Sequence, residues 1–161
     1  MFSKACEYGI KAMVYVAVQS INDKRVKVGD IAENIGTPEA FTAKILGALT
    51  KANYIDSIKG PYGGFEMSKT QREKLKLSEI VKSIDGDEIY KACSMGMKEC
   101  SDKNPCILHH KYVKVRQEIK HMLETTTIEN LAQEVVSGNS IISKEIFQNS
   151  SIKNGTKKCK H

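Results

Sequence analysis

The chain has 161 residues, of which 40% are hydrophobic and 27% charged, and its formal net charge is +6. A chain of this length forms one compact domain with appendages, which argues against a large multidomain enzyme. It has no apolar run behind a basic start and no stretch of about 18 apolar residues, so we expect a cytoplasmic protein with no membrane association. In that reducing compartment the five cysteines are poor disulfide candidates, which favours metal binding or redox chemistry for those that cluster.

The positive charge is concentrated at the C-terminal end. Residues 1–69 hold 9 basic and 7 acidic groups, residues 70–137 hold 11 of each, and residues 138–161 hold 5 and 1. The last segment is rich in Ser, Asn and Lys, so we expect 138–161 to be a partly disordered tail. Nucleic-acid binding is therefore argued from motifs in the rest of the chain and not from net charge.

The first half of the chain predicts two helices joined by a tight turn. Small and apolar residues at helical spacing predict a core helix over Lys4–Val18, and a short helix is expected over Gly29–Ile35 with a stop at Gly36. Thr37-Pro38-Glu39 then carries three helix-start signals: an N-cap residue, a first-turn proline and an acidic side chain. The second helix of the pair is predicted from Pro38 to about Lys51.

This second helix is expected to have a buried and an exposed face, and a hairpin follows it. Its predicted buried stripe comprises Phe41, Ile45, Leu46 and Leu49. The other face has small or polar residues that would let the helix approach base edges: Glu39, Ala40, Ala43, Lys44 and Gly47. A strand-like run over 54–59, a turn over 60–64 and a return strand over 65–67 predict the hairpin. The fold class is thus mainly α with a small β-hairpin wing, a winged helix-turn-helix over residues 1–86.

Three cysteines, Cys93, Cys100 and Cys106, lie in a polar stretch at 87–106, after a short helix predicted over 78–84. Asn104-Pro105-Cys106 has helix-start signals, so Cys106 is expected at a positive helix end that favours the thiolate. His109 follows on the same face. Three thiols and an imidazole favour a metal or iron–sulfur centre over a disulfide framework. Zinc is an alternative, although zinc sites usually show tighter CxxC pairs.

The region 105–137 is expected to hold a long helix and a following short one. A helix of about 20 residues from Pro105 would have apolar residues at coiled-coil spacing over two heptads. These residues are Leu108, Tyr112, Val115, Ile119 and Met122. A stripe of this length fits either intramolecular core or a dimer interface. Thr125-Thr126-Thr127 is expected to cap the short helix that follows.

Several segments together resemble the Rrf2 family of bacterial transcription regulators. They are the N-terminal helix, the Gly36 turn, KGPYGGF at Lys59–Phe65, LSEIVKSIDG at Leu77–Gly86, the spaced cysteines, and TIENLA at Thr127–Ala132. The resemblance covers residues 1 to about 136, and the wing and the cysteine spacing are its most specific parts. The family includes an iron–sulfur regulator, a nitric oxide sensor and a regulator of cysteine metabolism.

The resemblance implies a homodimer, paired through the long helix, that binds a roughly palindromic operator in double-stranded DNA. The residues that fall where the family's recognition helix approaches the major groove are Thr37, Pro38, Thr42 and Lys44. Lys59 matches the basic wing residue that enters the minor groove, and Tyr62 of the wing turn completes the expected DNA-binding set. Lys44 is as well suited to a phosphate contact as to base reading.

The resemblance also implies a sensor of redox state, nitric oxide or iron–sulfur status. Cys93, Cys100 and Cys106 match the thiols that hold a two-iron or four-iron cluster in cluster-bearing members. The fourth ligand is either His109 or Glu7, the latter supplied across the dimer. The alternative is a regulator without a cluster, controlled by a partner protein or by thiol oxidation. An enzyme is not expected, because the chain has no CxxC, phosphate-binding glycine loop or serine elbow.

Overall fold

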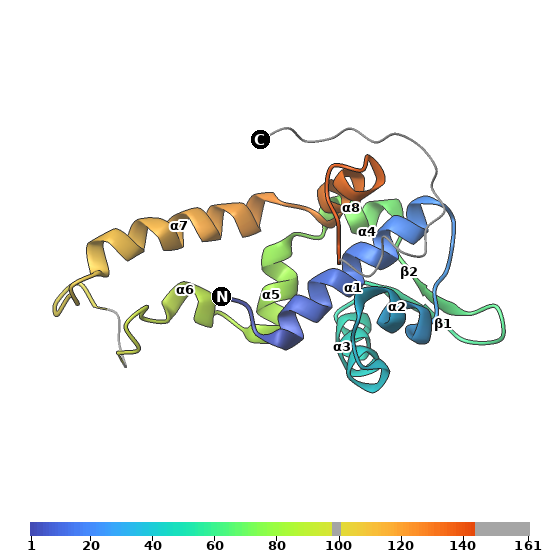
Figure 1. Ribbon diagram of the computed structural model, residues 1–161, viewed down its shortest axis with the longest axis horizontal. Helices are drawn as coiled ribbons and strands as arrows, with labels where there is room; N and C mark the ends of the chain where they lie inside the picture. Colours follow the sequence, from blue (N-terminus) through green and yellow to red (C-terminus); the bar gives the residue numbers. More distant parts are fainter. Residues whose placement is uncertain (98–100, 144–161) are drawn as a thin grey trace.

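The computed structural model describes residues 1–97 and 101–143. Cys100, Cys159 and the tail from residue 144 onward lie outside the described residues. The elements are α1 (Lys4–Ile21), α2 (Val28–Ile35), α3 (Glu39–Lys51), β1 (Asp56–Ile58), β2 (Gly64–Glu66), α4 (Lys69–Lys74), α5 (Leu77–Asp85), α6 (Glu88–Lys91), α7 (His109–Thr125) and α8 (Ile128–Val136). The fold is mainly helical with one antiparallel hairpin, as the sequence predicts (Figure 1). None of the described helices is long and apolar enough to cross a membrane.

Helix α1 is the centre of the core. Ser3 caps its N-terminus by accepting a hydrogen bond from the Cys6 N–H at 3.1 Å. All six residues from Ala12 to Ala17 are buried, because α2, α3, α5 and α8 all contact this helix. This middle part of α1 is covered on several sides, which explains why residues 12–17 include no charged side chain.

The turn between α2 and α3 forms as the sequence predicts. Gly36 adopts a left-handed conformation with φ of 67°, and its N–H bonds to the main chain of α2. Left-handed backbone is costly for residues with a Cβ, which explains a glycine at this position. Helix α3 begins at Glu39, with Pro38 rather than Thr37 as the residue before its first turn. The two helices are thus held at a fixed angle by a tight connection.

The buried stripe of α3 differs by one residue from the prediction. Ile45, Leu46 and Leu49 are buried, but Phe41 is 37% exposed and Thr42 is buried in its place. Residues 42, 45, 46 and 49 share one face at helical spacing, whereas residue 41 lies at its edge. The Phe41 ring packs edge-on against Tyr8 of α1, with ring centroids 5.8 Å apart. Phe41 therefore covers the rim of the core rather than filling it.

The wing is a short hairpin held against the body by the residues that follow α1. β1 pairs with β2 in the register Asp56↔Glu66 and Ile58↔Gly64. Val26 extends this ladder by exchanging main-chain hydrogen bonds with Phe65. A Cβ at Gly64 would lie 2.8 Å from the Val26 carbonyl oxygen, so only glycine permits this approach. The hairpin is therefore anchored at its base and exposed at its tip.

Helix α7 projects from the body, and α6 packs beside it (Figure 1). It begins at His109, not at Pro105, because residues 106–108 form a turn in which the His109 N–H bonds to the Cys106 carbonyl at 3.0 Å. Cys106 thus precedes the helix instead of occupying its first turn. The other end of α7 is docked by Leu123, which is fully buried. Thr127 then caps α8, as predicted.

Candidate DNA-binding surface and cysteine loop

The exposed face of α3 contains the small and polar residues expected from the sequence. Glu39, Ala40, Ala43, Lys44 and Gly47 are all exposed. A Cβ added at Gly47 would meet no atom within 4 Å, so this side of the helix is open. A face with few bulky side chains allows the backbone of a helix to come close to base edges in the major groove.

Thr37 and Thr42 form a pair at the start of α3. The Thr42 hydroxyl donates to the Pro38 carbonyl at 3.0 Å, and its oxygen lies 2.7 Å from the Thr37 hydroxyl. Because the single Thr42 proton is used on Pro38, Thr37 is the donor between the two hydroxyls. Thr42 is only 1% exposed. Its side chain is therefore placed to orient Thr37 and is not itself exposed.

The wing presents Lys59 and Tyr62 at its exposed end. Tyr62 is 91% exposed, and Lys59 is also exposed. Arg25 supports the base of the wing, since its Nε lies 2.6 Å from a carboxylate oxygen of Glu66 on β2. Hydrogen bonding to Glu66 raises the pKa of Arg25. A fixed base with an exposed tip suits a hairpin that contacts the minor groove of DNA beside the major groove approached by α3.

The cysteine loop is described apart from residues 98–100. Cys93 follows α6 and Cys106 precedes α7, and both are partly exposed. Cys100, between them, lies outside the described residues. Within residues 1–97 and 101–143, no three His, Cys, Asp or Glu side chains come together as a metal shell. The donor types nonetheless match an iron–sulfur centre, which is held chiefly by cysteine thiolates.

His109 occupies a buried position at the first residue of α7. It is 4% exposed, and its Nε2 lies 2.6 Å from a carboxylate oxygen of Asp102. Its ring also packs edge-on against His110. When Nε2–H donates to a carboxylate, Nδ1 carries the lone pair, and metal-binding histidines are commonly oriented in this way. Sequence reasoning missed Asp102, and nothing in its local pattern marks it as a histidine partner.

Glu7 lies in the first turn of α1, close in sequence to Ser3, which contacts the end of α5. Its carboxylate is 2.7 Å from the Lys4 ammonium, and this hydrogen bond lowers the pKa of Glu7. The Ser3 N–H and hydroxyl both donate to Asp85, the last residue of α5. The start of α1 is therefore joined to the point from which α6 and the cysteine loop leave the body.

Arg116 fastens the loop to α7. Its guanidinium donates to the carbonyls of Tyr90 at 3.3 Å and Ala92 at 3.2 Å, just before Cys93. The same group lies over the Tyr112 ring, 5.3 Å from its centroid. Displacement of the loop at Cys93 would consequently act on α7. Sequence reasoning missed this residue, since nothing local predicts contacts that span more than twenty positions.

Helix α7 leaves part of its apolar stripe exposed. Leu108, Val115 and Met122 are 40%, 50% and 43% exposed, whereas Tyr112 and Ile119 are half-buried. The stripe predicted from sequence is thus covered only in part within one subunit. Such a face on a projecting helix is typical of an interaction surface.

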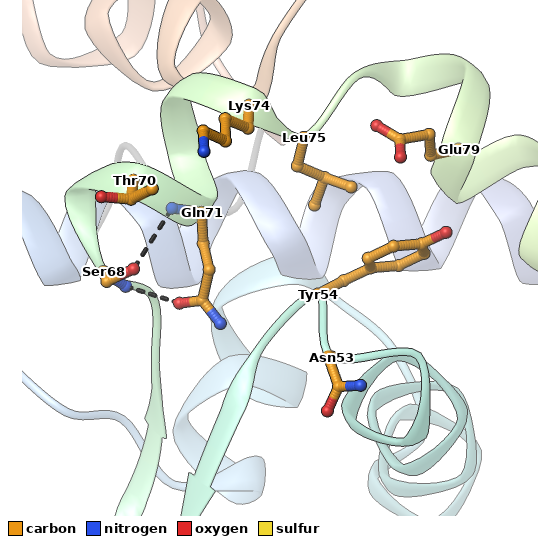
Figure 2. Close-up of a pocket in the computed structure, with 8 residues that line it drawn as sticks. All are labelled: Asn53, Tyr54, Ser68, Thr70, Gln71, Lys74, Leu75 and Glu79. Carbon is orange, nitrogen blue, oxygen red and sulfur yellow. Dashed lines mark hydrogen bonds between the residues drawn. The ribbon is translucent and has the colours of Figure 1, made fainter.

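An open pocket of about 250 Å³ lies between α4, α5 and the turn after α3 (Figure 2). Ser68 and Gln71 line it and hydrogen-bond each other reciprocally, which caps α4. Tyr54 forms another wall, and burial, followed by the charge of Glu79, raises its pKa. None of the residues expected to bind DNA or metal lies in this pocket.

Two helices joined by a glycine turn, an exposed α3 face and a hairpin wing define a winged helix-turn-helix DNA-binding protein. The Rrf2 family, described as iron-dependent transcriptional regulators, matches residues 2–134. The chain belongs to this family and is a transcription regulator rather than an enzyme. The resemblance seen in the sequence is confirmed.

Two similar proteins illustrate the relationship. A putative HTH-type transcriptional regulator of Aquifex aeolicus is 33% identical over 133 residues, which cover 81% of this chain and 90% of that protein. The HTH-type transcriptional regulator IscR of Photorhabdus laumondii is 26% identical over 131 residues, covering 80% and 78%.

Solved structures share the fold. CymR, the global cysteine regulator of B. subtilis, superposes with a TM-score of 0.66 at 20% identity, covering 83% of this chain and 96% of that one. IscR of T. potens gives 0.64 at 18% identity, covering 88% and 92%. At these identities the likeness concerns the fold alone.

Proposed function

We propose that this regulator binds double-stranded DNA as a homodimer, and that an iron–sulfur cluster held by its cysteine loop controls the binding. The observation that carries the DNA-binding part is the open face of α3 beside the exposed wing. Thr37, Pro38 and Lys44 would meet the major groove, while Lys59 and Tyr62 of the wing would meet the adjacent minor groove. Thr42 supports Thr37 from within the core.

The exposed apolar residues of α7 would pack against the same helix of a second copy of this chain. Leu108 immediately precedes α7, and Val115 and Met122 lie on it. Because this helix extends beyond the body (Figure 1), its apolar face has little of its own subunit to cover it. Pairing of two such helices about a two-fold axis would present two copies of α3. That symmetry requires a palindromic operator whose half-sites are separated by one or more turns of DNA.

Cys93, Cys100 and Cys106 would hold the cluster, with His109 as the favoured fourth ligand. The His109–Asp102 contact supports this choice, because metal-binding histidines commonly have a carboxylate partner that orients the ring. Glu7 is the alternative, since the Lys4 pair keeps its carboxylate ionised and partly exposed. A bound cluster supplies a centre that reacts with nitric oxide or oxygen.

Residues of α7 connect the cysteine loop to the core that holds the DNA-reading helix α3. Arg116 joins the main chain before Cys93 to α7, and Leu123 joins α7 to the core. Movement of the loop would shift α7 and thereby the separation of the two reading helices. A coupling of about 1.4 kcal/mol is enough to change DNA affinity tenfold.

A second candidate is thiol-based control without a cluster. The observation in its favour is the partial exposure of the two loop cysteines that the structure describes. In this case Cys93 and Cys106, both partly exposed, would respond by oxidation or by contact with a partner protein. Iron and sulfide contents separate the two candidates.

The DNA-binding surface is tested with Lys44→Ala and Lys59→Ala, using duplexes selected by the wild-type protein from a random pool. Each substitution should weaken binding and make it less salt-dependent, because it removes a cation near phosphates. Lys82→Ala on α5, also an exposed lysine, is the matched control. Unaltered affinity and footprint in both variants would refute the assigned surface.

The cluster is tested by anaerobic reconstitution followed by iron, sulfide and visible-absorption measurements. Cys100→Ala should lose the chromophore, whereas Cys159→Ala, a cysteine outside the loop, should retain it. His109→Ala and Glu7→Gln then identify the fourth ligand by which of them shifts the spectrum. A wild-type protein that stays colourless and metal-free, with DNA binding unchanged by Cys100→Ala, would refute cluster control.

A further inference from the structure

The segment that joins α1 to α2 runs along the wing. Figure 1 shows this connection passing from the end of α1 beside the hairpin to the start of α2. The Val26 carbonyl accepts a hydrogen bond from the Phe65 N–H at 2.8 Å, and the Val26 N–H donates to the Phe65 carbonyl at 3.2 Å. Lys27, the next residue, is the N-cap of α2. The segment is therefore attached to β2 of the wing immediately before α2 begins.

The start of α2 also lies against the start of α3. A Cβ added at Gly29, in the first turn of α2, would lie 3.6 Å from a carboxylate oxygen of Glu39. Glu39 is the first residue of α3. Lys27 consequently lies between the two elements proposed to read DNA, because the residue before it is bonded to the wing and the residue two positions after it adjoins α3.

Two cations of this segment are exposed and without a carboxylate partner in the part of the chain that the structure describes. Arg25 is paired with Glu66 of β2 at 2.6 Å. Lys24 and Lys27, on either side of it in the sequence, are exposed, and neither forms an ion pair with a residue in 1–97 or 101–143. The Asp30 carboxylate accepts a hydrogen bond from the main-chain N–H of Lys27 at 3.3 Å. The ammonium groups of the two lysines are thus available to an anionic ligand.

We propose that Lys24 and Lys27 bind phosphates of the DNA strand that runs between the major groove met by α3 and the minor groove met by the wing. This inference rests on the proposed DNA binding and adds a contact between its two reading elements. When two parts of a protein occupy adjacent grooves, the sugar–phosphate backbone that separates the grooves passes between those parts. The first helix of a helix-turn-helix pair crosses the backbone, and Lys27 directly precedes that helix here.

The two lysines would position the protein on DNA without reading its sequence. Phosphate contacts fix the register and orientation of a protein on the duplex, whereas base contacts provide specificity. Because the segment is bonded to the wing and adjoins α3, a phosphate held here would fix both reading elements relative to the same backbone strand. Each lysine that neutralises a phosphate also releases counterions, so the affinity that it adds falls as salt is raised.

The test replaces both lysines in the full-length chain, once by glutamine (Lys24→Gln with Lys27→Gln) and once by arginine. Affinities for a duplex selected by the wild-type protein and for a mixed-sequence duplex are measured by fluorescence anisotropy between about 50 and 200 mM salt. The glutamine variant should lose affinity for both duplexes by the same factor, and its slope of log K against log salt should become shallower by about 2 per chain. The arginine variant should keep the wild-type slope. Lys82→Gln on α5, the matched control, should change neither the affinity nor the slope.

Two results of this experiment would overturn the proposal. One is an unchanged salt slope in the glutamine variant. The other is a loss of affinity confined to the selected duplex, because the lysines would then read bases and not phosphates.

A second measurement places the contact on the DNA. Neutral methylphosphonates replace the phosphates between the half-site and the adjacent minor groove of the selected duplex. The wild-type protein should bind this duplex more weakly than the unmodified one, and the glutamine variant should lose less. Unchanged wild-type affinity, or equal losses in the two proteins, would contradict a contact between these lysines and these phosphates.

The outcomes distinguish this inference from the proposed function. If Lys44→Ala and Lys59→Ala weaken binding while the glutamine variant does not, only the phosphate contact is refuted. If the wild-type protein binds no duplex, the proposed function itself is wrong.

Discussion

Thr42→Val should weaken DNA binding although the side chain does not reach the surface. The substitution removes the hydroxyl that bonds to Thr37 and to the Pro38 carbonyl, both at the start of α3. A neutral hydrogen bond contributes about 0.5–1.5 kcal/mol, and valine fills nearly the same volume. We therefore expect the free energy of unfolding to fall by about 1–2 kcal/mol. The Thr37 hydroxyl, no longer held, should lose its fixed orientation toward DNA.

A double-mutant cycle with Thr37→Val isolates the contact between the two hydroxyls. Unfolding in urea and DNA binding by anisotropy are measured for both single variants and the double variant. Residues in direct contact give coupling energies of 0.5–3 kcal/mol, and a single neutral bond predicts a value near the lower end, about 1 kcal/mol. In affinity, this corresponds to about fivefold.

Thr50→Val is the matched control for this cycle. Its hydroxyl donates to the Leu46 carbonyl at 2.8 Å, a similar bond at the other end of α3. It should reduce stability by a comparable or smaller amount and leave DNA affinity unchanged. A coupling energy near zero between Thr37 and Thr42, or equal DNA affinity of the Thr42 and Thr50 variants, would refute the supporting role of Thr42.

Three further predictions concern the body of the protein. Leu123→Ala should lower the free energy of unfolding by about 2–5 kcal/mol in urea, because this fully buried side chain docks α7, and a loss well below 1 kcal/mol would contradict that docking. Burial acts to raise the pKa of Glu129, but hydrogen bonds from Gln133 and Arg72 outweigh it and the pKa is lowered. The ionised carboxylate therefore stabilises the fold above pH 4.5, the ordinary pKa of the group, and this stabilisation is lost as the pH falls through the lower pKa of the folded state. The free energy of unfolding of the wild-type protein should accordingly exceed that of Glu129→Gln near neutral pH but not in acid. A difference that does not depend on pH would refute this prediction. Burial raises the pKa of the Cys6 thiol to about 12, so mass spectrometry should find it unalkylated in the folded protein at about pH 8 and alkylated in urea; equal labelling in both states would count against its burial.

The elements that could be predicted are those whose signals are local. Gly36 followed by Thr37-Pro38-Glu39 indicates a turn and a helix start, and the structure has both within one residue. Helix α4 also has a local signal that was overlooked, the capping box of Ser68 and Gln71. Residues 42, 45, 46 and 49 have regular helical spacing, but a polar Thr42 in a buried stripe also requires hydrogen bonds for its hydroxyl, which the local sequence does not show.

Features that depend on distant contacts could not be predicted from local sequence. Pro105 signals a helix start, yet the helix begins only at His109, whose ring is held by Asp102. The attachment of Arg116 to the Cys93 end of the loop spans more than twenty residues, and that of Ser143 to Asn34 spans more than one hundred. Such contacts follow from the packing of the whole chain, not from the pattern around either residue.

The most direct test of the central claim is the DNA affinity of one preparation measured anaerobically with the cluster bound and again after its removal. Iron and sulfide are quantified in both samples, and the duplex is one selected by the protein. Cluster control predicts that the two affinities differ by about tenfold or more, since that requires only about 1.4 kcal/mol of coupling. Equal affinities in samples whose iron contents differ as intended would contradict it.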